Sequence, residues 1–330
     1  MKIWFPMSKA GTGSEILTRQ LAKNLLQAGV ETVVTPYSPL FEISTKALTA
    51  FGLKPPAGTT LIHANAATAE GFSRFGIPMV LTAHGAFERA VYDQHKRYRQ
   101  RQFHSKVVRP GIEASLQNAS ALTAVSRWVA DIYRQEYAAK KVEVISNWID
   151  TNLFSPSTRT RSRKLLFVGR PAWQKGSHLL PALSALLGPD FELTCTLREN
   201  EWAGAVPEHV RLIGPVAQHD MPELYRSHDA LLVPSIAEGF CLAAAEAMAC
   251  GLPVFGFQGH GLDDVLEPVA GFCSAGMLDV NGLSECVRNV FADEKLYREV
   301  SAMGREHVIT HFTPQIALEK YLALYAKVRA

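Results

Sequence analysis

Segments with the apolar pattern of β-strands alternate with helix-like segments along most of this chain. In the first half, the strand-like runs cover residues 2–7, 31–37, 60–65, 78–85, 121–126 and 142–146. In the second half, they cover residues 164–170, 191–198, 210–216, 230–235 and 253–257. Strands that alternate with helices form parallel sheets with helices on both faces, so the sequence predicts an α/β fold.

Helix boundaries and one polar stretch divide the chain into domains. Ser14 is placed to cap a first helix over 14–28, with Gly29 after its end. The stretch 150–163 is rich in Ser, Thr and Arg, which makes it the best linker candidate. We therefore expect a first domain over 1–155, a second over 156–315 and a terminal helix over 316–330.

Composition narrows the class of protein. The chain has 330 residues and is 47% hydrophobic, which suits two globular domains. A net charge of +3 gives no reason to expect a nucleic-acid partner. No apolar run approaches the roughly 20 residues of a membrane-spanning helix, and the first residues do not resemble a secretory signal. The five cysteines include no C-x-x-C pair, so a reduced, cytoplasmic setting is expected and a structural zinc site is not.

The stretch 234–254 places two glutamates around the start of a helix. A buried strand ends before Glu238, which therefore lies in a loop at a carboxyl end of the sheet. The alanine-rich run 242–250 predicts a helix that carries Glu246 and ends before Gly251. Free N–H groups at this helix start suit a phosphate, and a carboxylate can accept hydrogen bonds from both hydroxyls of a diol. Taken alone, each glutamate is better explained as a solvated residue at an end of a buried helix.

The whole string from Glu238 to Val254 resembles the E-(seven residues)-E signature of the retaining glycosyltransferases of family 4. Other segments resemble the same family, namely V-G-R with K-G at 168–176, a strand-end His84, the glycine loop 10–14, the segment 212–216 and the segment 144–150. The resemblance implies the GT-B fold, with two Rossmann-like, doubly wound parallel-sheet domains facing a cleft. It also implies that the terminal helix packs back on the first domain.

The resemblance further implies a reaction and roles for individual residues. A sugar would move from a nucleotide sugar to an acceptor hydroxyl, with retention at the anomeric carbon and without a metal or cofactor. The implied catalytic residues are Glu238, His84, Arg170 and Lys175. The implied donor-binding residues are Gly13, Val216, Gly239, Phe240, Cys241, Leu242 and Glu246. Glu246 would hold the ribose, Glu238 and His84 the sugar, and the two cations the diphosphate; the choice among UDP, GDP and ADP forms stays open.

Three positions depart from known patterns. Trp148 stands where the family usually has glycine, and Cys241 lies in a turn where glycine is common. The loop 10–14 also agrees in part with the dinucleotide-binding pattern G-x-G-x-x-G, but Ile16 stands at the third glycine position. No acidic residue ends the second strand, so a nicotinamide cofactor is not favoured.

The segment 92–109 is rich in Lys and Arg and has no acidic residue after Asp93. A solvated helix is the preferred explanation of this pattern. The alternative is contact of Lys96–Arg109 with an anionic membrane surface or with a phosphorylated lipid or sugar acceptor. The resemblance implies a glycan or lipid-linked acceptor, as in polysaccharide or lipopolysaccharide assembly. We therefore expect a cytoplasmic protein that is compatible with the inner face of the membrane.

Alternative functions fit a similar site. A sugar-nucleotide epimerase with this fold would convert its donor to an isomer without an acceptor. A non-catalytic module would bind a nucleotide sugar and release it unchanged. A phosphorylase-like enzyme would need inorganic phosphate or a cofactor lysine, for which the sequence offers no support.

Overall fold

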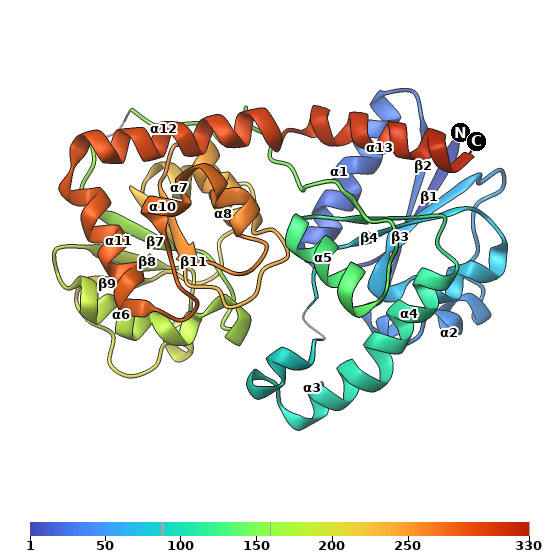
Figure 1. The fold of residues 1–330 in the computed structure, drawn as a ribbon, viewed down its shortest axis with the longest axis horizontal. Helices are drawn as coiled ribbons and strands as arrows, with labels where there is room; N and C mark the ends of the chain where they lie inside the picture. The colour runs from blue at the N-terminus through green and yellow to red at the C-terminus, as the bar shows by residue number, and fades with distance from the viewer. Residues whose placement is uncertain (87–88, 159, 330) are drawn as a thin grey trace. The chain divides into compact units, whose positions relative to one another are not determined.

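The computed structural model describes residues 1–86, 89–158 and 160–329, and these form two compact units. Unit 1 contains Met1–Asn147 together with Pro314–Ala330, and unit 2 contains Trp148–Thr313. The change from unit 1 to unit 2 therefore falls earlier in the chain than the composition suggests. Figure 1 shows the elements of both units.

Unit 1 is built on a parallel sheet of six strands in the order β2-β1-β3-β4-β5-β6. The strands are β1 Lys2–Ser8, β2 Glu31–Tyr37, β3 Leu61–Asn65, β4 Met79–Ala83, β5 Ala121–Ala124 and β6 Glu143–Val144. The helices are α1 Gly13–Gln27, α2 Thr45–Ala50, α3 Tyr98–Phe103, α4 Arg109–Gln117, α5 Arg127–Glu136 and α13 Pro314–Arg329. The prediction of a parallel α/β sheet is confirmed for this unit.

Unit 2 repeats the architecture with the strand order β12-β11-β10-β7-β8-β9. The strands are β7 Lys164–Phe167, β8 Glu192–Cys195, β9 Val210–Leu212, β10 Ala230–Val233, β11 Val254–Phe257 and β12 Ser274–Ala275. The helices are α6 Leu180–Leu187, α7 Met221–Arg226, α8 Leu242–Ala249, α9 Asp263–Leu266, α10 Ala270–Cys273, α11 Val280–Ala292 and α12 Glu294–His311. Both sheets reverse strand order beside a central strand, and ligands of such sheets bind at the carboxyl ends near this reversal.

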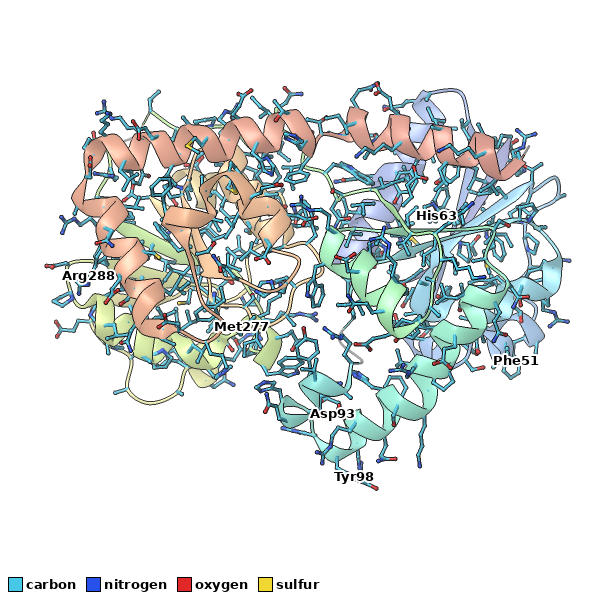
Figure 2. All side chains as sticks on the ribbon, in the orientation of Figure 1. Phe51, His63, Asp93, Tyr98, Met277 and Arg288 are labelled. Atoms are coloured by element: carbon cyan, nitrogen blue, oxygen red, sulfur yellow. The ribbon has the colours of Figure 1, made fainter. Side chains whose placement is uncertain are left out.

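The final helix α13 belongs to unit 1 because its tyrosines bond to the sheet. Tyr325 Oη and Thr82 Oγ1 lie 2.6 and 2.7 Å from the two ring nitrogens of His63, which is labelled in Figure 2. Tyr321 Oη lies 3.4 Å from Thr82 Oγ1. Figure 1 shows α13 beside α1, and the two helices are in contact. A buried and satisfied polar network of this kind specifies one way of packing the helix.

The start of the first helix differs from the prediction. The helix begins at Gly13, its N-cap is Thr12, and Ser14 lies inside the first turn. Ser14 Oγ lies 2.8 Å from Thr12 Oγ1, so it does not cap the helix. The carboxylate of Glu15 instead accepts a bond of 2.9 Å from the N–H of Gly11. This acidic side chain supplies the negative charge that a helix start favours.

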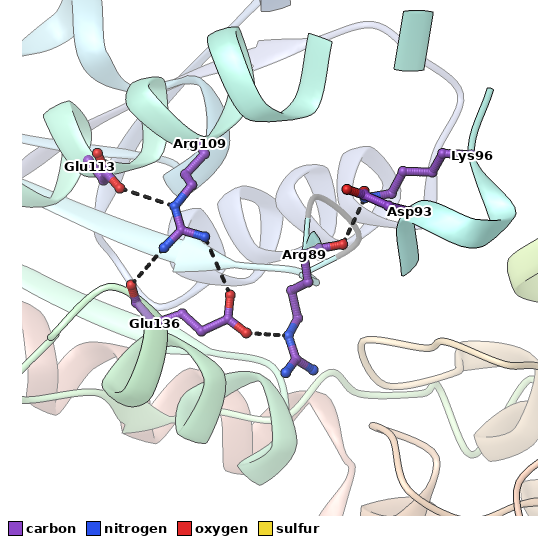
Figure 3. Close-up of polar contacts among 6 residues, drawn as sticks. All are labelled: Arg89, Asp93, Lys96, Arg109, Glu113 and Glu136. Carbon is purple, nitrogen blue, oxygen red and sulfur yellow. Dashed lines mark hydrogen bonds and ion pairs between the residues drawn. The ribbon is translucent and has the colours of Figure 1, made fainter. Parts of the chain in front are cut away.

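The basic segment is not a single solvated helix. A 3-10 turn over Ala90–His95 is followed by α3, a π-helical turn over His104–Val108 and then α4. The Lys96 side chain is fully buried and donates to Asp93 at 3.0 Å and to the carbonyl of Arg89 at 2.8 Å. Figure 3 shows Arg89 and Arg109 paired with Glu136. The two ends of the predicted cationic stretch are therefore neutralised inside the unit.

The remaining cations of this segment are exposed. Arg97, Arg99, Arg101 and Lys106 form no ion pair with any described residue. Tyr98 and Phe103 between them are 67% and 37% exposed. No helix among the described residues has the length and apolar character needed to cross a membrane.

Candidate functional site

The loop that follows β10 is hydrogen-bonded to the loop that follows β7. The N–H groups of Ile236 and Ala237 donate to the carbonyl of Gln174 at 2.8 and 3.3 Å. Gly176 has φ +67°, and a Cβ there would lie 1.7 Å from the carbonyl oxygen of Pro234. Only glycine allows this approach, which brings the K-G motif beside the loop that carries the first glutamate.

Glu238 and Lys175 form a largely buried ion pair. Lys175 Nζ donates to Glu238 Oε1 at 2.7 Å, and the Glu238 side chain is only 7% exposed. Ser235 Oγ donates to the same Oε1 at 2.8 Å. Burial lowers the pKa of Lys175, but the carboxylate of Glu238 outweighs it, and the pKa is raised overall. Glu238 Oε2 accepts no bond from a described residue, so it is available to a ligand.

Arg170 adds a second positive charge near Lys175. It lies in the loop after β7, is exposed, and makes no hydrogen bond or ion pair with the described residues. Its charge acts on Lys175, whose pKa it lowers. The N–H donors of the guanidinium are therefore available to an anionic group, which arginine can bind in a bidentate manner.

The start of α8 presents backbone donors beside this pair. Across the part of the chain that the structure describes, the N–H groups of residues 239–243 have no acceptor. The first N–H groups of a helix lack partners within it and attract anions. The Phe240 ring is buried against Phe312, with ring centres 5.0 Å apart, so only its backbone is offered to a ligand. Leu242 begins the helix, and Gly239 precedes it in the loop.

Cys241 adopts a backbone conformation that normally belongs to glycine. Its φ is +79°, in the left-handed region, and it forms the N-cap of α8 without a side-chain capping bond. This conformation explains in physical terms why glycine is common in such a turn. Burial raises the pKa of the Cys241 thiol, which therefore stays protonated and is a poor nucleophile.

Glu246 lies in the second turn of α8 and accepts hydrogen bonds from two side chains. Tyr225 Oη donates to Glu246 Oε2 at 2.9 Å, and Gln218 Nε2 donates to Oε1 at 3.5 Å. Burial raises the pKa of Glu246 to about 7, against the two hydrogen bonds, which lower it. Gln218 brings the segment after β9, including Val216, toward Glu246. Glu246 and the helix start thus belong to the same helix of unit 2, and Gln218 links the segment after β9 to Glu246.

In unit 1, His84 lines a cavity at the carboxyl end of β4. The cavity has a volume of about 260 Å3, and its wall includes His84, Asn65, His104 and Tyr133. Burial lowers the pKa of His84 to about 4, so the ring is neutral near pH 7. A neutral imidazole can donate and accept one hydrogen bond each, which suits a hydroxyl-bearing ligand.

Gly13 is the first residue of α1 and lies in the same unit as His84. The neighbouring Gly11 N–H is occupied by the Glu15 carboxylate, whose pKa this bond lowers. Glu15 also pairs with Arg19 at 2.9 Å. A phosphate at this helix start would meet the negative charge of Glu15, so the geometry favours hydroxyl contacts there.

Several neighbours of the glutamates were not identified from the sequence. Ser235 lies within the stretch 234–254 but was not singled out, and Tyr225 and Gln218 lie outside that stretch, with no spacing rule that links them to the glutamates. The described residues contain no group of three or more His, Cys, Asp or Glu side chains that could hold a metal ion.

Family models match most of the chain. Residues 149–307 match the model described as "Glycosyl transferases group 1". Residues 50–153 match the model described as "Glycosyltransferase Family 4".

Curated relatives are 26–31% identical to this chain over the segments that align. An alpha-maltose-1-phosphate synthase of Mycolicibacterium smegmatis is 27% identical over 78% of this chain and 74% of its own length. A D-inositol 3-phosphate glycosyltransferase of Arthrobacter sp. is 31% identical over 44% of this chain. The match covers 38% of that second relative, so this chain spans well under half of its length.

Solved structures share the fold over the full length. A sucrose-phosphate synthase from Thermosynechococcus elongatus has a TM-score of 0.80 at 19% identity, and the match covers 99% of both chains. The Anabaena protein HepE, solved with UDP-glucose, has a TM-score of 0.75 at 18% identity. That match covers 99% of this chain and 100% of HepE. The similarity shows that both units together have the GT-B fold.

Proposed function

We propose that this chain, which belongs to the group 1 glycosyltransferases of family 4, transfers a sugar from a nucleoside diphosphate sugar with retention of anomeric configuration. The observation that carries the proposal is the grouping in unit 2 of the Glu238–Lys175 pair with the unoccupied N–H groups at the start of α8. Glu246 lies on the same helix and completes a site for phosphate and hydroxyl groups.

The diphosphate is bound by cations and backbone donors. Arg170 and Lys175 supply positive charge, and the N–H groups at the start of α8 supply directed hydrogen bonds. The negative charge on the diphosphate grows as the bond to the sugar breaks, so these groups stabilise the transition state more than the ground state. They also supply the charge that a metal would otherwise provide, and we therefore propose a metal-independent reaction.

The ribose is held by Glu246. Its two oxygens are spaced to accept bonds from vicinal hydroxyls, and Tyr225 and Gln218 fix the carboxylate in place. The backbone around Val216 receives the base. HepE was solved with UDP and with UDP-glucose, and a starch synthase of Arabidopsis thaliana with ADP. UDP and ADP sugars are therefore the first donors to examine.

The transferred sugar contacts Glu238 in unit 2, and the contact expected from His84 in unit 1 stays a prediction of the family resemblance. Glu238 Oε2 accepts bonds from sugar hydroxyls while Oε1 stays paired with Lys175. His84 is neutral, so it can bond to a hydroxyl without adding positive charge beside a developing oxocarbenium ion. In this proposal Glu238 and His84 bind sugar hydroxyls and hold no metal. Orientation of the substrates and electrostatic stabilisation account for the catalysis.

The acceptor is a glycan or a lipid-linked sugar, as in polysaccharide or lipopolysaccharide assembly. Four exposed cations, Arg97, Arg99, Arg101 and Lys106, lie beside exposed Tyr98 and Phe103 in unit 1. Such a surface binds anionic lipid headgroups through charge and partial burial of the aromatic rings. We propose that it brings the enzyme to a membrane that carries its acceptor.

A panel of UDP, GDP and ADP and their glucose derivatives tests the donor site by thermal shift. One nucleotide should raise the melting temperature in a saturable way, and Glu246→Ala should lose that rise. Glu285→Ala, which removes an exposed glutamate on α11 of the same unit, is the matched control and should keep it. No shift with any member of the panel would overturn the nucleotide-sugar proposal.

Sedimentation with vesicles tests the membrane surface. Vesicles with about 30% phosphatidylserine should bind the wild type at low salt and release it at high salt. Arg99→Glu with Arg101→Glu should abolish binding without changing donor affinity. Equal binding to neutral vesicles would contradict the electrostatic basis of this proposal.

A further inference from the structure

A histidine outside the family motifs lies directly beneath the Glu238 loop. His260 is fully buried in the turn that follows β11. Its Nε2 lies 2.9 Å from the carbonyl oxygen of Ser235, and the N–H of Leu262 donates to its Nδ1 at 3.3 Å. Because Nδ1 accepts, the proton is on Nε2, and the ring donates to Ser235.

Ser235 connects His260 to Glu238. Its hydroxyl donates to Glu238 Oε1 at 2.8 Å, the same oxygen that accepts from Lys175. With Oε1 held by two donors, the carboxylate plane is set and Oε2 is presented in one direction. The buried imidazole therefore supports the backbone of the residue that orients the carboxylate.

The turn around His260 is itself closely packed on the loop. The N–H of Gly261 donates to the carbonyl of Glu238 at 3.0 Å, and a Cβ on Gly261 would lie 2.1 Å from the carbonyl oxygen of Gly239. Asp263 accepts from the N–H of Gly259 at 3.0 Å, which closes the turn from its other side. The turn can thus transmit the position of His260 directly to Glu238.

We propose that His260 is a positioning residue for Glu238, acting through the backbone and hydroxyl of Ser235 to aim Oε2 at the transferred sugar. This inference rests on the proposed function, because it concerns the sugar side of the donor site. The nucleotide side, formed by Glu246 and the start of α8, does not depend on this chain of bonds. Loss of His260 should therefore impair turnover far more than nucleotide binding.

The imidazole at 260 can be replaced so that only its bond to Ser235 is restored. His260→Gln places an amide nitrogen near the position of Nε2, whereas His260→Asn is too short to reach Ser235. His228→Gln replaces another buried histidine of unit 2, which bonds to the carbonyl of Leu224 at 2.7 Å, and serves as the control. Ser235→Ala removes the hydroxyl and keeps the backbone carbonyl that accepts from His260.

The experiment supplies a pool of mono- and oligosaccharide acceptors and measures nucleoside diphosphate release from whichever of UDP-, GDP- and ADP-glucose stabilises the wild type, alongside affinity for the bare nucleotide. We expect His260→Ala and His260→Asn to lower kcat by about 10²-fold, as small misplacements of a reacting group do, with the nucleotide Kd unchanged within about threefold. Ser235→Ala should lose at least about tenfold in kcat at an unchanged melting temperature, and His260→Gln should recover most of the rate.

Two results would overturn the inference. One is a His260→Ala enzyme with wild-type kcat; the other is a parallel loss of nucleotide affinity and kcat, which a general structural role would produce. Should His260→Ala fail to fold, a wild-type kcat in Ser235→Ala alone would overturn it. If the wild type itself neither binds nor turns over a nucleotide sugar, the proposed function fails instead, so the two failures are distinguishable.

Discussion

Replacing Glu246 by glutamine should make unit 2 more stable at alkaline pH and weaken nucleotide binding at the same time. Burial raises the pKa of Glu246 from 4.5 to about 7 in the folded protein. A group whose pKa is raised by folding contributes stability at low pH, and this contribution is lost as the pH rises through the folded value. The loss therefore falls between about pH 4.5 and pH 8 and is complete above that window.

The size of this change in stability follows from the pKa shift of Glu246. A rise from 4.5 to about 7 corresponds to an upper limit of about 3 kcal/mol. Glu246 is only half-buried, and solvent screening reduces this figure to about 1–2 kcal/mol. Glutamine has the same shape, stays neutral and can still accept the bond from Tyr225. Its stability relative to wild type should thus increase by about 1–2 kcal/mol between pH 5 and pH 8.5.

Thermal unfolding at a series of pH values measures this difference. For a unit of this size, about 1–2 kcal/mol corresponds to a relative rise of roughly 2–8 °C in melting temperature. Subtracting the wild-type curve removes the opposite contributions of buried histidines such as His63, whose pKa burial lowers to about 3. At pH 8.5 the variant should bind the nucleotide at least about tenfold more weakly, because it has lost charged acceptors for the ribose. A stability difference that does not change with pH would refute the argument.

Three further substitutions test the loops around the site. Cys241→Gly should be about 1 kcal/mol more stable than Cys241→Ala in chemical unfolding, because only glycine accepts φ +79° without strain; equal stabilities would contradict this. Gly176→Ala should cost at least about 3 kcal/mol and abolish turnover, since its Cβ would overlap the carbonyl of Pro234; a wild-type melting temperature would count against it. Lys175→Met should cost about 3 kcal/mol near neutral pH, because Glu238 would be left as an unpaired buried charge; the double change with Glu238→Gln should recover part of this loss, and no recovery would count against the ion pair.

Local patterns were sufficient to predict the elements that carry the site. Apolar runs ending before Glu238 and His84 predicted strand ends, and both residues do follow buried strands, β10 and β4. The alanine-rich run with Gly251 after it predicted α8, because helix propensity and the C-terminal glycine are local properties. The ends and the burial of these segments needed no long-range information.

Contacts between distant residues could not be predicted. Lys175 and Glu238 are 63 positions apart, and their pairing depends on the close approach of Gly176 to Pro234. The bond from Tyr225 to Glu246 arises only when α7 and α8 pack together. Such contacts are set by tertiary packing, which a single sequence does not display.

Charge patterns were the least dependable guide. Lys96 looks like the start of a cationic surface, yet its side chain is buried against Asp93. Ser14 has the chemistry of a cap, yet the helix begins one residue before it and Glu15 occupies the loop. In both cases a nearby acidic side chain, whose reach cannot be read from spacing alone, changes the outcome.

The central claim is sugar transfer with retention, and proton NMR of the reaction tests it most directly. The purified chain is incubated with the nucleotide sugar that stabilises it, with and without a pool of mono- and oligosaccharide acceptors, and the anomeric proton signals are followed. We predict acceptor-dependent release of the nucleoside diphosphate and a product with the anomeric configuration of the donor. Conversion of the donor to an isomer without acceptor, or a product of inverted configuration, would contradict the account.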